Sequence, residues 1–233
     1  MLQVNALQAF YGDFQALFGI DFVVRTGETV AIIGANGAGK STFLKTLCGQ
    51  LPAVPGAVQW DGQPIGGMPA HEIVRLGIAL VPEGRRLFPS LSVEENLRIG
   101  AFAKRPGRWN LARVYALFPA LYDKRHAPGT SLSGGQQQMV AIGRALMTNP
   151  RLLLCDEVSL GLSPAVVKDI YNALPDICSD GLSVVLVEQD IDTAIRAASQ
   201  IYCFMHGQVS LQGPSSALTK TQISAAYFGV GVT

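Results

Sequence analysis

The stretch Gly34-Ala35-Asn36-Gly37-Ala38-Gly39-Lys40-Ser41 decides the fold of this chain. It fits the pattern G-x-x-x-x-G-K-[ST] and stands between an apolar run, Glu28 to Ile33, and an amphipathic run, Ser41 to Leu47. These flanking runs predict a short buried strand before the glycines and a helix after them. A strand, a glycine-rich turn and a helix in this order predict a phosphate-binding loop.

The chemistry of this loop follows from its residue types. Glycines let the backbone wrap so that successive N–H groups point inward at phosphate, and the helix that follows adds the positive end of its dipole. Lys40 supplies charge for the β- and γ-phosphates, and Ser41 supplies a hydroxyl for Mg²⁺. The expected ligand is ATP, and the expected binding residues here are Gly34, Asn36, Gly37, Ala38, Gly39, Lys40, Ser41 and Thr42.

A second apolar run, Leu152 to Cys155, ends in two acids, Asp156 and Glu157. In an open parallel sheet, ligands bind at the carboxyl ends of the strands, so we expect Asp156 to reach the Mg²⁺ held by Ser41. Glu157 is then placed to polarise the attacking water. The alternative is a solvated strand end without a catalytic role.

Strand and helix patterns alternate over much of the chain and predict a parallel α/β sheet. Alternation at 2–6 and a β-rich run at 20–24 predict an antiparallel pair at the N-terminus. From Pro82 to Leu132 the β signal fades, which predicts a helical lobe. The other predicted strands are 78–81, 151–155, 182–187, 201–205 and 208–211, and the other predicted helices are 70–76, 136–147, 164–174 and 191–198.

Composition excludes several classes of protein. Of the 233 residues 48% are hydrophobic and 15% charged, so the chain is too apolar for intrinsic disorder. The net charge of +1 provides no overall field that would gather nucleic acid. The apolar runs are too short to span a bilayer, and the N-terminus lacks the pattern of a secretory signal, so we expect a protein that stays in the cytosol. The four cysteines lack metal-ligand spacing and are expected to be reduced and mostly buried.

A third motif, Leu132-Ser133-Gly134-Gly135-Gln136, stands directly before a predicted helix. Taken alone, it is either a second anion-binding nest or an N-cap with a flexible approach. Together with the phosphate loop and the paired acids, it makes the whole chain resemble the nucleotide-binding domain of the ATP-binding cassette (ABC) family. In that family the LSGGQ segment of one subunit closes over ATP bound to the phosphate loop of the other. The resemblance therefore implies that Ser133, Gly134 and Gly135 bind nucleotide across a head-to-tail dimer.

The same resemblance implies the architecture and the cofactors. The fold would be that of a P-loop NTPase with a RecA-like parallel core, an N-terminal antiparallel β region and an inserted α-helical subdomain. A single domain would cover 1–233, with 1–83 and 151–233 as the catalytic core and about 84–150 as the helical subdomain. The reaction would be hydrolysis of ATP to ADP and phosphate with Mg²⁺.

Further residues match the family position by position. Tyr11 matches the aromatic that stacks on adenine, with a core or surface tyrosine as the alternative. Glu83 stands where most members have Gln, and we expect it to act in catalysis on the metal side. Gln189 stands where most have His contacting the γ-phosphate. Val158 replaces the usual Pro, and Ser163 replaces the usual Asp of the segment that crosses the dimer interface.

Three segments narrow the resemblance. VPEGRRLFPSLSVEENL (81–97), SLGLSP (159–164) and VEQD (187–190) are similar to the ATP-binding subunits of bacterial branched-chain amino-acid importers. Urea-importer subunits are similar too, but Glu83 favours the amino-acid branch. This resemblance implies a second ABC ATPase subunit, identical or homologous, two membrane permease subunits and, indirectly, a periplasmic solute-binding protein. It also implies a peripheral location on the cytoplasmic face of the inner membrane.

One alternative comes from another class: an ABC-type ATPase that acts on nucleic acid or ribosomes. Such proteins carry a long coiled coil between the phosphate loop and LSGGQ, or two cassettes in one chain. The stretch from Ser41 to Ser133 leaves no room for the coiled coil, so no nucleic-acid partner is expected.

The segment Pro82 to Pro89 is expected to sense the γ-phosphate and to face the transporter. Gly84 can absorb a backbone change, and Leu87 and Phe88 are large apolar groups in a loop-like context. The alternative is that Leu87 and Phe88 only pin the helical lobe to the core.

Overall fold

Residues 1–229 are described by a computed structural model in which the chain divides into two units. Unit 1 is Met1–Ile73 with Ser183–Thr233, of which 183–229 are described, and unit 2 is Val74–Leu182. The first boundary falls inside helix α2 (Ala70–Leu76). Each unit contains parallel strands and the helices that cover them.

An antiparallel sheet forms the start of unit 1. Strand β1 (Leu2–Tyr11) pairs with β2 (Phe14–Val24) and with β4 (Val58–Trp60), which pairs in turn with β5 (Gln63–Pro64). The predicted antiparallel pair is confirmed, and both strands extend to a two-residue turn. Strands β4 and β5 were not predicted, because runs of three and two residues are too short to show alternation.

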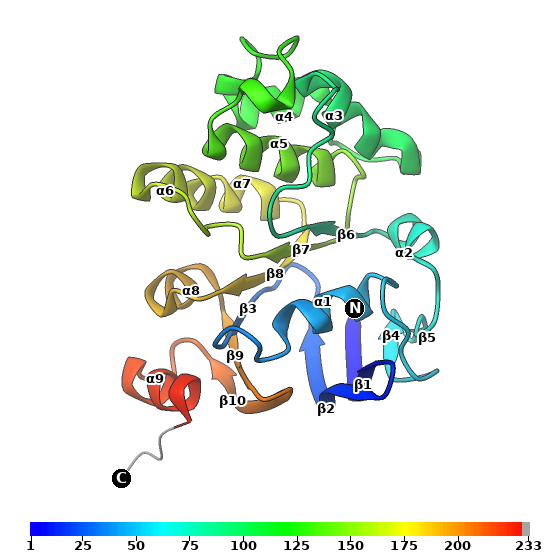
Figure 1. Cartoon of the computed structure of the whole chain (residues 1–233), viewed down its shortest axis with the longest axis vertical. Coiled ribbons are helices and arrows are strands. Elements are labelled where there is room, and N and C mark those ends of the chain that lie inside the picture. Colours follow the sequence, from blue (N-terminus) through cyan, green and yellow to red (C-terminus); the bar gives the residue numbers. More distant parts are fainter. Residues whose placement is uncertain (230–233) are drawn as a thin grey trace. The chain divides into compact units, whose positions relative to one another are not determined.

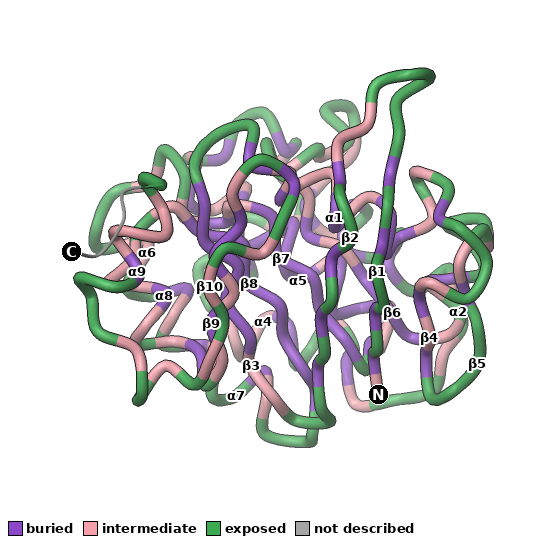
Figure 2. The backbone as a smooth tube through the Cα atoms, turned by 90° about the horizontal axis from the view of Figure 1, so that it is seen from below, coloured by how far each residue is buried: buried purple, intermediate pink, exposed green. Residues whose placement is uncertain are grey.

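The parallel strands of unit 1 are β3 (Thr29–Ile33), β8 (Ser183–Glu188) and β9 (Gln200–Met205). Strand β10 (Gln208–Pro214) is antiparallel to β9, and the order is β10-β9-β3-β8. Helices α8 (Ile191–Ala197) and α9 (Lys220–Phe228) pack on these strands (Figure 1). Figure 2 shows β3 and β8 as buried along most of their length. The core joins residues of the strands to residues of both helices: Ala31, Ile33, Ala194, Ala198, Ile201, Cys203 and Ile223.

Helix α1 (Lys40–Leu47) follows the phosphate loop and is fixed by aromatic packing. The ring of Phe43 lies 4.9 Å from that of Phe22 in β2 and 5.4 Å from that of Phe204 in β9, measured between centroids. Both contacts are edge-to-face, the arrangement that aromatic quadrupoles favour. The helix therefore connects the antiparallel and parallel parts of unit 1.

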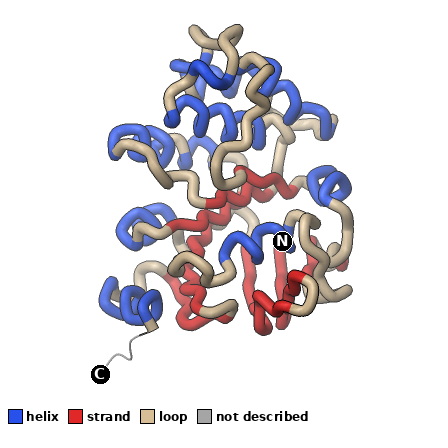
Figure 3. The backbone as a smooth tube through the Cα atoms, viewed as in Figure 1, coloured by secondary structure: helices blue, strands red, loops and turns tan. Residues whose placement is uncertain are grey.

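Unit 2 combines two parallel strands with a group of helices (Figure 3). Strand β6 (Ile78–Val81) pairs with β7 (Leu152–Asp156). Helices α3 (Val93–Gly100), α4 (Leu111–Leu117) and α5 (Gly134–Leu146) pack together, and a Cβ on Gly143 would lie 2.7 Å from Val114 and 2.8 Å from Leu97. The helical lobe predicted from Pro82 to Leu132 is confirmed.

One predicted helix is wrong in its extent. The pattern predicted a single helix over 164–174, whereas α6 (Pro164–Asn172) ends earlier and α7 (Leu174–Cys178) begins anew. The break comes at Ala173, and Pro175 lies in the first turn of α7, where its missing N–H is tolerated, whereas inside one continuous helix it would remove a backbone hydrogen bond. Helix α9 was missed, since its apolar residues do not lie on one face. The cysteines carry thiols as expected, and Cys48, Cys155 and Cys203 are buried.

Candidate functional site

The phosphate loop lies against the backbone of β9 and of the turn after it, all within unit 1. A Cβ on Gly34 would stand 2.4 Å from the carbonyl oxygen of Phe204, so only glycine fits there. Gly39 has φ +101° and a Cβ on it would lie 2.8 Å from a methyl of Leu17. The N–H of Gly207 donates to the Ala38 carbonyl at 3.0 Å. The loop is thus held by close backbone contacts that its glycines permit.

The first turn of α1 is open to an anion. Its N-cap is Gly39, which offers no capping side chain to the helix N–H groups. Lys40 is buried, and its Nζ donates to the carbonyls of Gly34 at 2.7 Å and Ala35 at 3.1 Å. The side chain therefore folds back along the loop. A helix N-terminus beside a lysine ammonium favours a phosphate group in both charge and hydrogen bonding.

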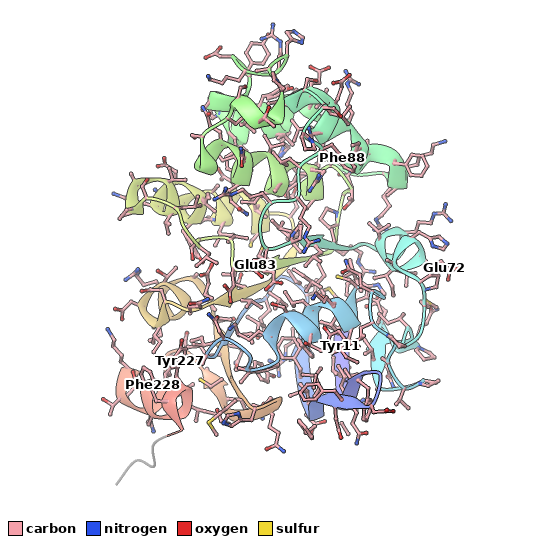
Figure 4. All side chains as sticks on the ribbon, in the orientation of Figure 1. Tyr11, Glu72, Glu83, Phe88, Tyr227 and Phe228 are labelled. Carbon is pink, nitrogen blue, oxygen red and sulfur yellow. The ribbon has the colours of Figure 1, made fainter. Side chains whose placement is uncertain are left out.

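Tyr11 lies at the end of β1, next to the helix that follows the loop (Figure 4). Its hydroxyl is 3.4 Å from Oγ1 of Thr42, and 45% of the residue is exposed. The tyrosine is therefore not part of the core. That the ring stacks on a bound base stays a prediction, with a surface tyrosine as the alternative.

Gln189 and Asn36 meet at the carboxyl ends of unit 1's parallel strands. Ile33 pairs with Glu188, so the residues after both strands emerge at the same edge. Nε2 of Gln189 donates to Oδ1 of Asn36 at 3.0 Å. The structure thus brings the predicted γ-phosphate residue to the phosphate loop.

The acidic candidates lie at the corresponding edge of the strands in unit 2. Val81 pairs with Cys155, so Glu83 and Glu157 each follow two residues beyond a paired position. Asp156 is buried, Glu157 is partly buried with φ +49°, and Glu83 is exposed on the loop that leaves β6 (Figure 4). A left-handed backbone at a non-glycine residue is a form of strain that is frequent at functional sites.

Ser133 begins α5 through a capping box. Its hydroxyl accepts from the Gln136 N–H at 3.3 Å, and the Gln136 side chain accepts from the Ser133 N–H at 3.1 Å. Because the hydroxyl accepts in this cap, its own proton stays available to donate to an anion. A Cβ on Gly135 would lie 2.6 Å from Val166 of α6, so this glycine is also required for helix packing.

The structure also places the two residues, Val158 and Ser163, at which the chain departs from the usual family pattern. Val158 is buried directly after Glu157. Ser163 is the N-cap of α6 without a side-chain hydrogen bond, and Pro164 occupies the first turn. Neither residue disturbs the elements that carry the paired acids.

Two polar residues that sequence reasoning missed hold the segment after Glu83. Asn96 of α3 is fully buried, accepts from the N–H of Phe88 at 2.9 Å and donates to the Phe88 carbonyl at 3.1 Å. Arg144 of α5 donates to the carbonyls of Arg85 and Arg86, each at 2.9 Å. Phe88 itself is 47% exposed, so the lobe holds its backbone rather than its ring.

Two features are absent from the described residues, 1–229. Within residues 1–229 no group of three or more His, Cys, Asp and Glu is placed to hold a metal ion. Over the same residues we find no helix with the length and hydropathy needed to span a bilayer.

A glycine-rich loop and its lysine between β3 and α1, with acids at the ends of parallel strands, define an ATP-binding protein of the P-loop class. The family model described as ABC transporter matches residues 17–159, more than half of the chain. This chain belongs to the ABC transporter family.

Named relatives cover the chain almost completely. It is 42% identical to the high-affinity branched-chain amino acid transport ATP-binding protein BraG of Pseudomonas aeruginosa, over 98% of this chain and 100% of that protein. It is 32% identical to the probable branched-chain amino acid transport ATP-binding protein LivF of Archaeoglobus fulgidus, over 94% of each. A solved dimer of an ATP-binding cassette in a post-hydrolysis state, bound to ADP and phosphate, matches with a TM-score of 0.83 at 26% identity, over 94% of this chain and 100% of that one.

These comparisons confirm the resemblance stated from the motifs. The chain is a nucleotide-binding ATPase subunit of an ABC transporter, with the P-loop NTPase fold predicted from its sequence.

Proposed function

We propose that this chain hydrolyses ATP to drive the import of branched-chain amino acids through separate permease subunits. The observation that carries the solute assignment is the 42% identity to BraG over nearly the whole of both chains. Glu83 and the VEQD segment, which ends at Asp190, support the same branch.

The triphosphate would bind to the phosphate loop and the first turn of α1, with Lys40 against the β- and γ-phosphates and Tyr11 against the base. Gln189 would contact the γ-phosphate, where its amide can donate a hydrogen bond but carries no titrating proton. Glu157 would accept a proton from the attacking water. Glu83 would act beside it on the metal side.

Mg²⁺ is the metal that the donor set fits. Ser41 offers a hydroxyl and Asp156 a carboxylate, the hard oxygen ligands that Mg²⁺ takes alongside substrate phosphates and water. Glu83 would stand close to the ion. When bound, Mg²⁺ neutralises charge that develops on the phosphates. Ser41, Asp156 and Glu83 would together hold and orient the metal–nucleotide complex.

Two such subunits would act together. Ser133, Gly134 and Gly135 of one chain would close over the nucleotide of the other, identical or homologous, head to tail. A related cassette has been solved as a dimer with ADP and phosphate, which supports this proposal. The segment of about 84–150 would form the helical subdomain, and 1–83 with 151–233 the catalytic core. The complete assembly would add two permease subunits and a periplasmic binding protein, with this chain on the cytoplasmic face of the inner membrane.

The second candidate is a urea or amide importer. It shares the VEQ pattern, but Glu83 replaces the Gln usual there. A role on nucleic acid or ribosomes has the least support, because the net charge is +1 and the stretch from Ser41 to Ser133 leaves no room for a long coiled coil.

Reconstitution tests the proposal. The chain is co-expressed with candidate permease subunits, and the complex is placed in proteoliposomes with a periplasmic solute-binding protein. We expect leucine, isoleucine or valine to accumulate with ATP and to raise ATP hydrolysis, whereas urea does neither. Stimulation by urea alone would overturn the amino-acid assignment, and a complete absence of ATP hydrolysis would overturn the proposed function.

A further inference from the structure

The backbone directly after Glu83 is strained. Gly84, Arg85 and Arg86 have φ values of +72°, +65° and +45°. Side chains with a Cβ rarely adopt this left-handed region, and two such residues in succession are less common still. Both arginines therefore hold a conformation that their neighbours must maintain.

Within the segment the N–H of Arg85 donates to the Pro82 carbonyl at 3.3 Å and that of Arg86 to the Gly84 carbonyl at 2.6 Å, and Arg144 binds the segment from outside. One guanidinium nitrogen donates to the Arg85 carbonyl and another to the Arg86 carbonyl, each at 2.9 Å. The same guanidinium lies 5.7 Å from the ring centroid of Phe88. Burial lowers the pKa of Arg144 below its usual value. The planar fork of an arginine suits two adjacent acceptors, whereas the single ammonium of a lysine does not.

The side chain of Arg85 extends toward the start of the signature helix α5. Its Nη1 donates to Oε1 of Gln137 at 3.4 Å, and its guanidinium lies 3.2 Å from the place of a Cβ on Gly134. The segment after Glu83 thus touches Gly134 with the side chain of Arg85 and is bound at its carbonyls by Arg144 of the same helix. All of these residues lie in unit 2.

We propose that Arg144 is a positioning residue that holds 84–86 in the left-handed conformation, so that Glu83 and the signature residues Ser133–Gly135 keep one fixed relation. The proposal rests on the proposed roles of Glu83 and of the signature segment in ATP hydrolysis. Under it, a shift at Glu83 is transmitted to α5 through the carbonyls that Arg144 binds. Loss of the hydrogen bonds from Arg144 to this segment lowers the rate of ATP hydrolysis. It leaves nucleotide affinity unchanged, because the phosphate loop belongs to unit 1.

A matched pair of substitutions at Arg86 tests whether turnover depends on the left-handed backbone at this residue. Its side chain is exposed, so Arg86→Gly and Arg86→Val remove the same group and differ in backbone preference. Glycine accepts a positive φ and a β-branched valine resists it. We expect Arg86→Val to lower kcat about tenfold with KM for ATP within about twofold, and Arg86→Gly to stay near the parent chain. Equal kcat values for the two variants would overturn the proposal.

Substitution of Arg144 tests whether its guanidinium keeps the segment in place. Arg144→Lys should lower kcat about tenfold, while calorimetry gives an unchanged Kd for ATP. Adding Arg86→Gly to this variant should recover part of kcat, because glycine adopts a positive φ without the hydrogen bonds from Arg144. Arg98→Lys, on an exposed helix face of the same unit, is the control. The proposal is overturned if Arg144→Lys lowers kcat by the same factor in the parent chain as in the chain that carries Arg86→Gly.

Other readouts separate this inference from general damage and from the proposed function. The thermal unfolding midpoint of each variant shows whether a loss of kcat comes from unfolding. If Arg144→Lys does not fold, the pair at Arg86 still decides. A parent chain without ATP hydrolysis would contradict the proposed function itself, whereas an active parent whose Arg86 and Arg144 variants keep its kcat would contradict only this inference.

Discussion

The phosphate loop and the segment after Glu83 both follow a buried strand, but they differ in which residues take up the strained positions and in what holds them. The loop places glycine at its demanding positions, Gly34 and Gly39, and is held by neighbouring backbone and by its own Lys40. The segment places arginines at left-handed positions and is held by two side chains, Asn96 and Arg144. Contacts between backbone groups leave little room for adjustment, whereas a side-chain hydrogen bond can be exchanged.

This difference suits the two stretches to different roles, nucleotide binding for the loop and sensing for the segment. A loop fixed by steric fit presents the same N–H groups to every nucleotide, as binding requires. A strained segment held by exchangeable side-chain hydrogen bonds can change conformation at a smaller cost, as the proposed sensor role would require. We therefore expect substitutions in the loop region to change affinity, and substitutions near the segment to change turnover or coupling.

The largest effect is expected at Glu157, which belongs to the same unit as the segment. Glu157→Gln should keep ATP binding and reduce hydrolysis at least about 100-fold, because the amide keeps the shape but cannot accept the proton from water. ATP should then hold the dimer closed in size-exclusion chromatography. Asp123→Asn, at an exposed position of the same unit, is the control. Turnover near that of the parent chain would remove Glu157 from the mechanism.

The next largest effect tests the fixed loop. Lys40→Ala should weaken ATP binding about 30-fold, because about 2 kcal/mol of charge-assisted hydrogen bonding to phosphate is lost. Calorimetry measures this Kd, with Lys45→Ala in the same helix as the control. Unchanged affinity would contradict the assignment of the loop as the phosphate-binding site. It would also contradict the expectation that substitutions in the loop change affinity.

A smaller effect is expected where the loop meets Gln189. Gln189→Ala should lower turnover several-fold, about tenfold at most, because one hydrogen bond to phosphate is lost. The pH profile of kcat should keep its shape, since an amide does not titrate near neutral pH. A changed profile would show that another group takes over, and an unchanged rate would make Gln189 a bystander.

The smallest effect in the isolated subunit is expected at Phe88. Its ring is about half exposed, while Asn96 holds its backbone, so Phe88→Ala should leave ATP binding and basal hydrolysis within about twofold. In the assembled transporter the same change should uncouple ATP use from solute uptake. Unfolding or a large loss of basal rate would instead place Phe88 among the residues that pin the lobe.

Glu83→Gln tests the same segment, since a metal-side carboxylate should lose Mg²⁺-dependent turnover when neutralised.

The same contrast explains how much the sequence could predict. The phosphate loop was predicted residue by residue because glycine, lysine and serine at fixed spacing carry a local chemical requirement. Helix α2 and strand β6 were predicted with correct bounds, since their patterns are complete within a few residues. By contrast, an arginine in a helical pattern such as Arg144 predicts a solvated face. Nothing in a sequence shows which distant carbonyls it binds, or that two arginines adopt a positive φ.

The lack of an N-capping side chain on α1 ties the stability of the protein to its ligand. Helices α3, α5 and α9 begin with capping boxes at Ser92, Ser133 and Thr219, whereas the N-cap of α1 is Gly39, which has no side chain to cap with. In the absence of nucleotide, amides in the first turn of α1 should exchange with solvent deuterium soon after mixing, and a bound polyphosphate should protect them. ADP or pyrophosphate should then raise the melting temperature, while adenosine should do so far less. At a ligand concentration about 100 times Kd this linkage adds about 2.7 kcal/mol, so a cell short of ATP would hold a measurably less stable subunit.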